Sequence, residues 1–202
     1  MDGNCVFCDR TKFEERLIGE TKNFWLIATL GQISDGGYTL LVPKRHVICL
    51  GAMREQEIRE FETIIARVCF AVPREYGVVS GMIFEHGIVG QTIKHAHLHL
   101  LPGALSIAER ICGDFPVSEI MTICFWDELR SLYIQRQEPY LLWVDFGGEI
   151  KVCWNPAAPA QYLRIVVAQA MNRPERANWR TMDPELDKKL WTETVSRLKS
   201  YF

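Results

Sequence analysis

Hydrophobic and polar positions in the first part of the chain predict a hairpin followed by a helix. Residues 23–30 and 37–43 are rich in β-forming residues and flank a segment with turn chemistry, so we expect them to pair as a β-hairpin. Between residues 53 and 72, apolar side chains recur at steps of three and four with Glu and Arg between them. This pattern predicts an amphipathic helix that is stopped by Pro73 and Gly77.

Two further strands are expected downstream of the helix. Residues 78–84 form the first, residues 85–91 a loop bracketed by glycines, and residues 95–101 the second, which Pro102 and Gly103 close. The order of two strands, a helix and two strands predicts an α+β fold built on an antiparallel sheet with one long helix.

The second half of the chain has its own strands and helices. Residues 104–116 are weakly patterned. Beyond them the pattern predicts a helix at 125–135, a hairpin of 139–146 with 149–154, and two helices at 160–172 and 184–201. We therefore expect a first domain at residues 1–115 and a smaller C-terminal α+β extension at 116–202.

Composition and charge exclude several classes of protein. The 202 residues are 48% hydrophobic, and 23 Lys and Arg stand against 25 Asp and Glu, giving a net charge of -2. This balance provides no global basic field for nucleic acid or acidic membranes. Apolar runs such as residues 24–30 are too short to span a bilayer, and the N-terminus lacks a secretory pattern. We expect a cytoplasmic protein.

The seven cysteines are consistent with the cytoplasm, because we expect most of them to be reduced thiols in the core rather than members of a disulfide framework. Cys5 and Cys8 are the exception. Their C-x-x-C spacing indicates a metal-binding or a redox pair, and the βαβ setting typical of a redox pair is missing.

Three of the five histidines, His95, His97 and His99, occupy alternate positions. In a strand, alternate side chains share one face, so these rings would line one surface. Packing three polar rings together costs free energy unless each has a partner, which makes a purely structural role improbable.

Two kinds of chemistry use such a row of imidazoles. One is a zinc or iron site, and the other is covalent catalysis in which a neutral ring attacks phosphorus. The upstream Gly87, Gly90 and Gln91 favour the second, because backbone N–H groups and an amide can bind an oxyanion.

With these histidines and the cysteine pair, the sequence resembles the histidine triad (HIT) family of nucleotide hydrolases and transferases. The resemblance runs through Cys5-Val6-Phe7-Cys8, then Gly37-Tyr38-Thr39-Leu40-Leu41-Val42-Pro43-Lys44-Arg45-His46, and then the segment from Gly90 to Pro102 that contains the three histidines. It covers residues 1 to about 105. The C-terminal part looks, more loosely, like the extension of longer family members.

The resemblance implies roles for particular residues. His97 matches the histidine that forms the covalent nucleotidyl intermediate, His99 the one that contacts the leaving group, and Gln91 the amide that holds the phosphates. Gly90 and His86 would join them in binding the nucleotide, although His86 and Glu85 could also be an ordinary surface pair. Cys5, Cys8, His46 and His95 match a closed Cys₂His₂ set, which is typical of structural zinc.

The expected function is hydrolysis of nucleoside phosphate derivatives, of dinucleoside polyphosphate or nucleoside phosphoramidate type, at the α-phosphate. The same intermediate would serve a nucleotidyltransferase or phosphorylase, and a non-catalytic nucleotide- or RNA-binding adaptor is the alternative from another class. The partner would be a small nucleotide substrate, and the resemblance implies a homodimer.

Some residues depart from the family pattern. Glu85 stands where family members often have Asn, and residues 28–31 lack the Asp that commonly binds the ribose. Arg173, Arg176 and Arg180 with Trp179 could bind a phosphate chain or stack on a base. We favour a solvated loop with one buried Trp, because charge clusters near helix ends are common.

Overall fold

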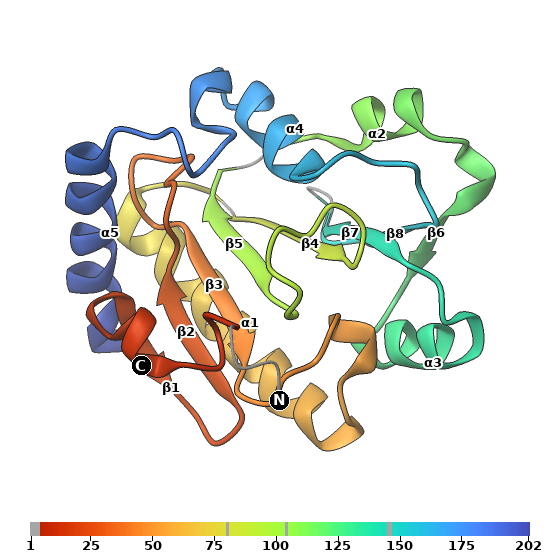
Figure 1. Cartoon of the computed structure of the whole chain (residues 1–202), viewed down its shortest axis with the longest axis horizontal. Coiled ribbons are helices and arrows are strands. Elements are labelled where there is room, and N and C mark those ends of the chain that lie inside the picture. The colour runs from red at the N-terminus through yellow and green to blue at the C-terminus, as the bar shows by residue number, and fades with distance from the viewer. Residues whose placement is uncertain (1–4, 80, 104, 145–146) are drawn as a thin grey trace.

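The computed structural model describes residues 5–79, 81–103, 105–144 and 147–202, and its centre is an antiparallel β-sheet (Figure 1). The strands are β1 (Leu17–Glu20), β2 (Phe24–Ala28), β3 (Thr39–Pro43), β4 (Gly81–Gly87), β5 (Leu98–Pro102), β6 (Ile120–Ile123), β7 (Tyr140–Val144) and β8 (Ile150–Trp154). They lie in the order β1-β2-β3-β5-β4-β7-β8-β6, and each neighbouring pair is antiparallel. The predicted α+β class is confirmed.

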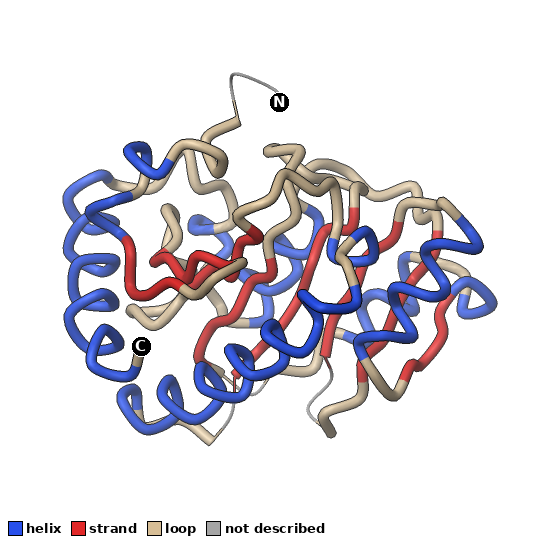
Figure 2. The backbone as a smooth tube through the Cα atoms, turned by 90° about the horizontal axis from the view of Figure 1, so that it is seen from below, coloured by secondary structure: helices blue, strands red, loops and turns tan. Residues whose placement is uncertain are grey.

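Helices cover both faces of this sheet. They are α1 (Glu55–Tyr76), α2 (Ala108–Asp114), α3 (Trp126–Arg136), α4 (Tyr162–Ala170) and α5 (Pro184–Leu198). Buried residues of α1 and α3 pack on strand residues such as Leu41 and Leu142, and those of α2 and α4 pack on the intervening Leu40 and Leu141. Figure 2 shows the strands as a tilted layer with α5 at one end. Within the described residues, every helix is too short or too polar to cross a bilayer.

The predicted hairpin of residues 23–30 and 37–43 is present as β2 and β3, which pair along their full lengths. Its long connecting loop is fixed from the other half of the chain. Asp187 of α5 accepts hydrogen bonds from the backbone N–H groups of Gly31 and Gln32, at 2.9 and 3.1 Å. The shape of this loop therefore depends on the C-terminal helix.

The helix α1 begins near its predicted start but passes through Pro73, which we expected to stop it. Proline is tolerated there because the ring lies in the last turn and costs one backbone hydrogen bond. Tyr76 in the added turn packs on Gly36 and Gly37, which offsets that loss. The helix ends at Gly77, whose φ of 64° lies in the left-handed region that glycine adopts readily.

The boundaries of β4 and β5 differ from the prediction. Glu85 and His86, expected in a loop, belong to β4 because this strand continues alongside β7. The local sequence could not reveal a partner more than fifty residues away. In turn, β5 begins only at Leu98, so His95 and His97 lie in the segment before it rather than in the strand. The prediction of three histidines on one strand was wrong for these two.

The second half of the chain contributes β6, β7 and β8 to the same sheet, because β7 pairs with β4. The predicted hairpin of β7 with β8 and the helices α3, α4 and α5 are present, although residues 145 and 146 lie outside the described residues. We did not predict α2 and β6, which are short. The domain division at residue 115 stays a prediction.

A buried carboxyl group joins the sheet to the loop before α1. Glu85 is fully buried on the α1 side of β4, where its Oε1 accepts a hydrogen bond from the backbone N–H of Leu50 at 2.8 Å and its Oε2 one from Tyr140 Oη at 2.6 Å. Burial raises the pKa of Glu85 to about 8. The folded protein therefore keeps this carboxyl largely protonated at neutral pH.

This raised pKa predicts how stability depends on pH. In the unfolded chain the carboxyl has its ordinary pKa of 4.5, so its contribution to stability is fully present below pH 4.5 and is lost as the pH rises through about 8. Between pH 6 and 8 the free energy of unfolding should fall by about 2 kcal/mol through this group alone. Urea unfolding across this pH range measures the free energy of unfolding of the unaltered protein and of Glu85→Gln. The difference between these two free energies should shrink as the pH rises.

Glu60→Gln is the matched control. Partial burial opposes ionisation of Glu60, but hydrogen bonds from Thr21 and from Asn23 outweigh it and lower the pKa of this carboxyl. Its contribution to stability should therefore stay constant from pH 6 to 8. If the free energies of unfolding of the unaltered protein and of Glu85→Gln differ by a constant amount from pH 6 to 8, Glu85 is already ionised in the folded state.

Candidate functional site

A cavity of about 720 Å³ lies on the face of the sheet that α4 covers. The residues predicted to bind or transform a substrate all line it: His86, Gly90, Gln91, His97 and His99. They come from β4, from the loop after it, and from β5 with the segment before it. The structure thus brings together groups that are up to thirteen positions apart in the sequence.

His97 presents one particular nitrogen to the cavity. Its Nδ1 lies 2.6 Å from the carbonyl oxygen of His95, which can only accept, so Nδ1 carries the proton and Nε2 keeps a lone pair. Burial lowers the pKa of His97 to about 4. The ring is therefore neutral at pH 7 and able to act as a nucleophile.

His99 lies beside it, with ring centroids 4.9 Å apart. The ring stacks on Phe84 at 4.3 Å, and its Nδ1 is 2.7 Å from Tyr38 Oη. Its Nε2 is buried and has no hydrogen-bond partner among the described residues. Burial lowers the pKa of His99 well below the ordinary value, so this ring is also neutral.

His86 is a cavity residue and not half of a surface pair with Glu85. The two side chains project from opposite faces of β4, because neighbouring residues in a strand alternate. His86 Nε2 accepts a hydrogen bond from the backbone N–H of Leu163 at 3.0 Å, so its proton is on Nδ1. Burial lowers the pKa of His86 to about 3. His86 therefore joins the cavity wall to α4.

Gly90 and Gln91 lie where the loop after β4 meets the start of α4. Gly90 has a φ of 73°, and a Cβ there would lie 2.7 Å from the carbonyl oxygen of Pro159, so only glycine fits. Its carbonyl oxygen accepts a hydrogen bond from the N–H of Gln161 at 2.9 Å. Gln91 Nε2 donates one hydrogen bond to Ile48, which leaves its second N–H for a ligand.

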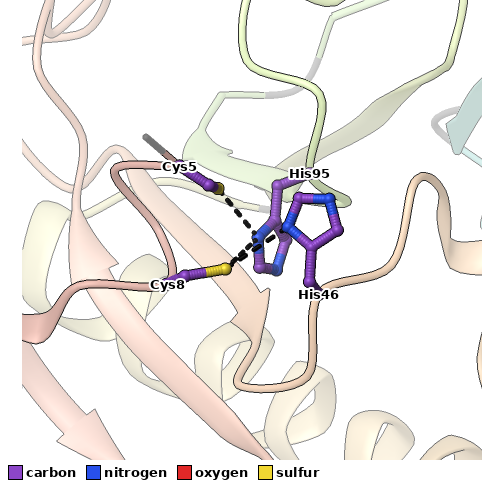
Figure 3. A group of neighbouring side chains, drawn as sticks. All are labelled: Cys5, Cys8, His46 and His95. Carbon is purple, nitrogen blue, oxygen red and sulfur yellow. Dashed lines mark hydrogen bonds between the residues drawn. The ribbon is translucent and has the colours of Figure 1, made fainter. Parts of the chain in front are cut away.

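Cys5, Cys8, His46 and His95 form a cluster at the edge of the cavity (Figure 3). Two of them, Cys5 and His46, also line the cavity. Nδ1 of His95 lies 3.3 Å from Sγ of Cys5 and 3.6 Å from Sγ of Cys8, and Nδ1 of His46 is 3.3 Å from Sγ of Cys8. A tetrahedral zinc ion with ordinary bond lengths separates its sulfur and nitrogen ligands by about 3.6 Å. His95 Nε2 donates to the carbonyl oxygen of Pro43 at 2.8 Å, which turns Nδ1 toward the thiols.

The cavity is lined by cationic side chains that we did not predict as site residues. Five of them come from both halves of the chain: Lys12, Arg16, Lys94, Arg164 and Arg180. Among the described residues, no Asp or Glu lines the cavity. Apart from Arg180, which belongs to the basic cluster noted near the C-terminus, these residues carry no local sequence signal, because folding brings them together over more than 160 positions.

The basic cluster near the C-terminus divides between two roles. Arg173 and Arg176 form ion pairs with Asp35, and those two cations lie away from the cavity. Arg180 and Trp179, in contrast, line the cavity. Arg180 is exposed and Trp179 is partly buried, as the interpretation of a solvated loop expects, but that interpretation did not place the pair at the cavity.

Trp179 also explains the glycine at position 31. Gly31 has a φ of 69°, and a Cβ there would come within 2.4 Å of Trp179 Cβ. The loop between β2 and β3 and the segment before α5 are thus in close contact. The C-terminal half forms one wall of the cavity through Gln161, Arg164, Trp179 and Arg180.

Comparison with known proteins finds similarity in the first half of the chain. Residues 10–105 match the family model described as the HIT domain. An uncharacterized HIT-like protein of Mycoplasma genitalium is 26% identical over 106 residues, which cover 49% of this chain and 72% of that protein.

Solved structures with a similar fold cover the same share. A HIT family protein from Bacillus anthracis is 24% identical, with a TM-score of 0.46. The match covers 50% of this chain and 74% of that protein's chain. A Zn-bound histidine triad family protein from Mycobacterium smegmatis is 27% identical with a TM-score of 0.43, and covers 49% of this chain and 74% of its own.

Proposed function

We propose that this protein, which belongs to the HIT family through the domain at residues 10–105, is a nucleotidyl hydrolase acting at the α-phosphate of nucleoside phosphate derivatives. The observation that carries the proposal is the state of His97. Its proton is fixed on Nδ1 by a backbone carbonyl, and its free Nε2 lies in a cavity lined by cations. A neutral, oriented imidazole facing a phosphate-binding cavity is suited to nucleophilic attack on phosphorus.

The reaction proceeds in two displacements at the same phosphorus. His97 Nε2 donates its lone pair to the α-phosphorus, and the new N–P bond forms as the bond to the leaving oxygen breaks with its electron pair on that oxygen. Water then attacks the phosphorus, the N–P bond breaks with its electrons returning to Nε2, and the water proton passes to solvent. The products are a nucleoside monophosphate and the leaving group.

Other residues bind the parts of the substrate that carry charge. In this proposal the second N–H of Gln91 and the backbone of Gly90, which both line the cavity, hold the non-bridging oxygens of the phosphate. His86 completes the wall, and His99 faces the leaving group. The two displacements are each promoted because the anionic oxygens meet donors that are already in place.

The charge of the cavity favours one class of substrate. Five cationic side chains line the cavity, and none of the described lining residues is a carboxylate. This charge suits a chain of several phosphates better than a phosphoramidate with an uncharged or cationic leaving group. We therefore place dinucleoside polyphosphates first. A nucleotidyltransferase or phosphorylase would use the same intermediate and differ only in the acceptor.

We also infer that Cys5, Cys8, His46 and His95 hold a structural zinc ion. The set is closed, with two thiolates and two imidazoles whose ligand atoms all lie within 4.8 Å of one another. When bound, the ion would tie the N-terminal turn to the segment carrying His97. Thiolates must stay reduced for this purpose, which is why we place the protein in the cytoplasm. The homodimer stays a prediction.

The first test is replacement of the nucleophile. His97→Ala should lower turnover by roughly 1,000-fold or more, because no other group can form the intermediate. The protein is assayed with dinucleoside polyphosphates, nucleoside phosphoramidates and adenylates, and release of the mononucleotide is followed by chromatography. A nucleotide labelled at the α-phosphate should leave an acid-labile label on the protein and none on His97→Ala.

The outcomes distinguish the alternatives. If His97→Ala keeps a tenth or more of the activity, a barrier change of roughly 1.4 kcal/mol or less, the covalent mechanism is wrong. Nucleotide passed to phosphate or a sugar phosphate in preference to water would identify a transferase. Tight binding of these nucleotides without turnover of any of them would identify the adaptor.

The second test separates His95 from His97, which are two positions apart. His95→Ala should lose zinc and lower the melting temperature by roughly 5–15 °C, because the binding free energy of a structural metal is part of the folding free energy. Cys5→Ser, Cys8→Ser and His46→Ala should behave alike. Elemental analysis and thermal unfolding with and without a chelator measure both effects.

His97→Ala is the matched control, because it removes an imidazole from the same segment without removing a ligand. It should keep about one zinc per chain, and a chelator should lower its melting temperature by as much as it lowers that of the unaltered protein, whatever stability the buried ring itself contributes. A metal-free, fully active protein would contradict the zinc assignment. Loss of metal from His97→Ala as well would point to a catalytic metal instead.

A further inference from the structure

Arg164 of α4 is a buried cation without an ion-pair partner among the residues that the structure describes. Its exposed fraction is 4%, and within the described part of the chain no Asp or Glu lies at ion-pair distance from it. Burying a charge in this way costs free energy unless hydrogen bonds compensate. Its partners are carbonyl oxygens and a phenol, namely those of Gly31, Ala177, Arg176 and Tyr38.

The contact with Tyr38 determines the direction of a chain of hydrogen bonds. Arg164 Nη1 can only donate, so at 3.0 Å Tyr38 Oη is the acceptor. The described residues give Tyr38 Oη one other partner, Nδ1 of His99 at 2.7 Å. The buried phenol therefore donates its single proton to that nitrogen, because in the reverse direction its O–H would have no acceptor.

This direction fixes the tautomer of His99. A neutral imidazole that accepts at Nδ1 carries its proton on Nε2. That Nε2 is buried and without a partner among the described residues, and His99 lines the cavity. His99 therefore presents a hydrogen-bond donor, whereas the neighbouring His97 presents a lone pair.

We propose that Arg164 and Tyr38 are positioning residues that hold His99 as an Nε2–H donor aimed at the leaving group. This inference rests on the proposed function, since it names what His99 does at the same site. An N–H group stabilises the oxygen that becomes an anion as the bond to phosphorus breaks. The opposite tautomer would direct a lone pair at that oxygen and repel it.

The inference makes the C-terminal half part of the catalytic arrangement. Arg164 is outside residues 10–105, which match the HIT domain, and it reaches Tyr38 across 126 positions. The same guanidinium also bonds to Gly31 and Ala177, so it joins the cavity to the segment that carries Trp179. A test must therefore separate positioning of His99 from support of this segment.

Tyr38→Phe makes that separation, because it removes the hydroxyl and keeps both the ring and the other bonds of Arg164. Hydrolysis is measured with the phenyl and the 4-nitrophenyl esters of a nucleoside 5′-monophosphate. A donor to the leaving oxygen matters most for the poorer leaving group. We expect kcat for the phenyl ester to fall by about 10- to 100-fold, a much smaller loss for the 4-nitrophenyl ester, and little change in KM.

Tyr76→Phe is the control, since it removes a hydroxyl that lies 3.5 Å from Thr194 Oγ1 and away from the cavity. It should leave both rates unchanged. Arg164→Lys keeps a cationic donor and should retain more of the phenyl ester rate than Arg164→Met. Equal slowing of both esters by Tyr38→Phe would assign Tyr38 a purely structural role and overturn the proposal.

The tautomer itself is read by NMR of the full-length protein with ¹⁵N-labelled histidine, with His99 assigned by His99→Gln. Two-bond correlations should show the proton of His99 on Nε2, and Tyr38→Phe should shift the Nδ1 resonance as its hydrogen bond is lost. A proton on Nδ1 in the unaltered protein would overturn the proposal. This reading needs no turnover, so it decides the tautomer even if neither ester is hydrolysed and the proposed function fails.

Discussion

The carbonyl oxygen of Pro43 lies 2.8 Å from Nε2 of His95, and the carbonyl oxygen of His95 lies 2.6 Å from Nδ1 of His97. A carbonyl oxygen can only accept, so each contact places the proton on one ring nitrogen and frees the other. The free nitrogen of His95 faces the two thiols, and that of His97 faces the cavity. Two identical side chains, two positions apart, are thereby suited to different chemistry by the backbone alone.

The third histidine of the row depends on a different kind of support. His99 has no backbone carbonyl on Nδ1 and relies on Tyr38, whose hydroxyl direction is set by a guanidinium from α4. The buried cation is tolerated because carbonyl oxygens around it accept its hydrogen bonds. They belong to Gly31 in the loop between β2 and β3 and to Arg176 and Ala177 in the segment after α4. The continuous sheet matters here, since the pairing of β4 with β7 is what places α4 over the histidines.

Features that depend on neighbouring residues could be predicted from the sequence, and features that depend on contacts between distant residues could not. The β-forming residues at 37–43 and the helical repeat of α1 are local signals, and both elements are present. The spacing of Cys5 and Cys8 and the triad pattern identified residues that the structure does bring together. The end of β4 depends on β7, and the partners of Arg164 lie up to 133 positions away, so neither could be predicted from neighbouring residues.

The charge of the whole chain and the charge of the cavity have opposite signs. The net charge of -2 argues against a long polyanion lying across the surface, because that mode of binding needs an extended basic face. Cations gathered around a cavity of about 720 Å³ act over a shorter range, where low-dielectric walls strengthen their effect on an enclosed ligand. This distribution supports the proposal of a small nucleotide substrate, whose phosphates would lie inside the cavity beside His97 and His99.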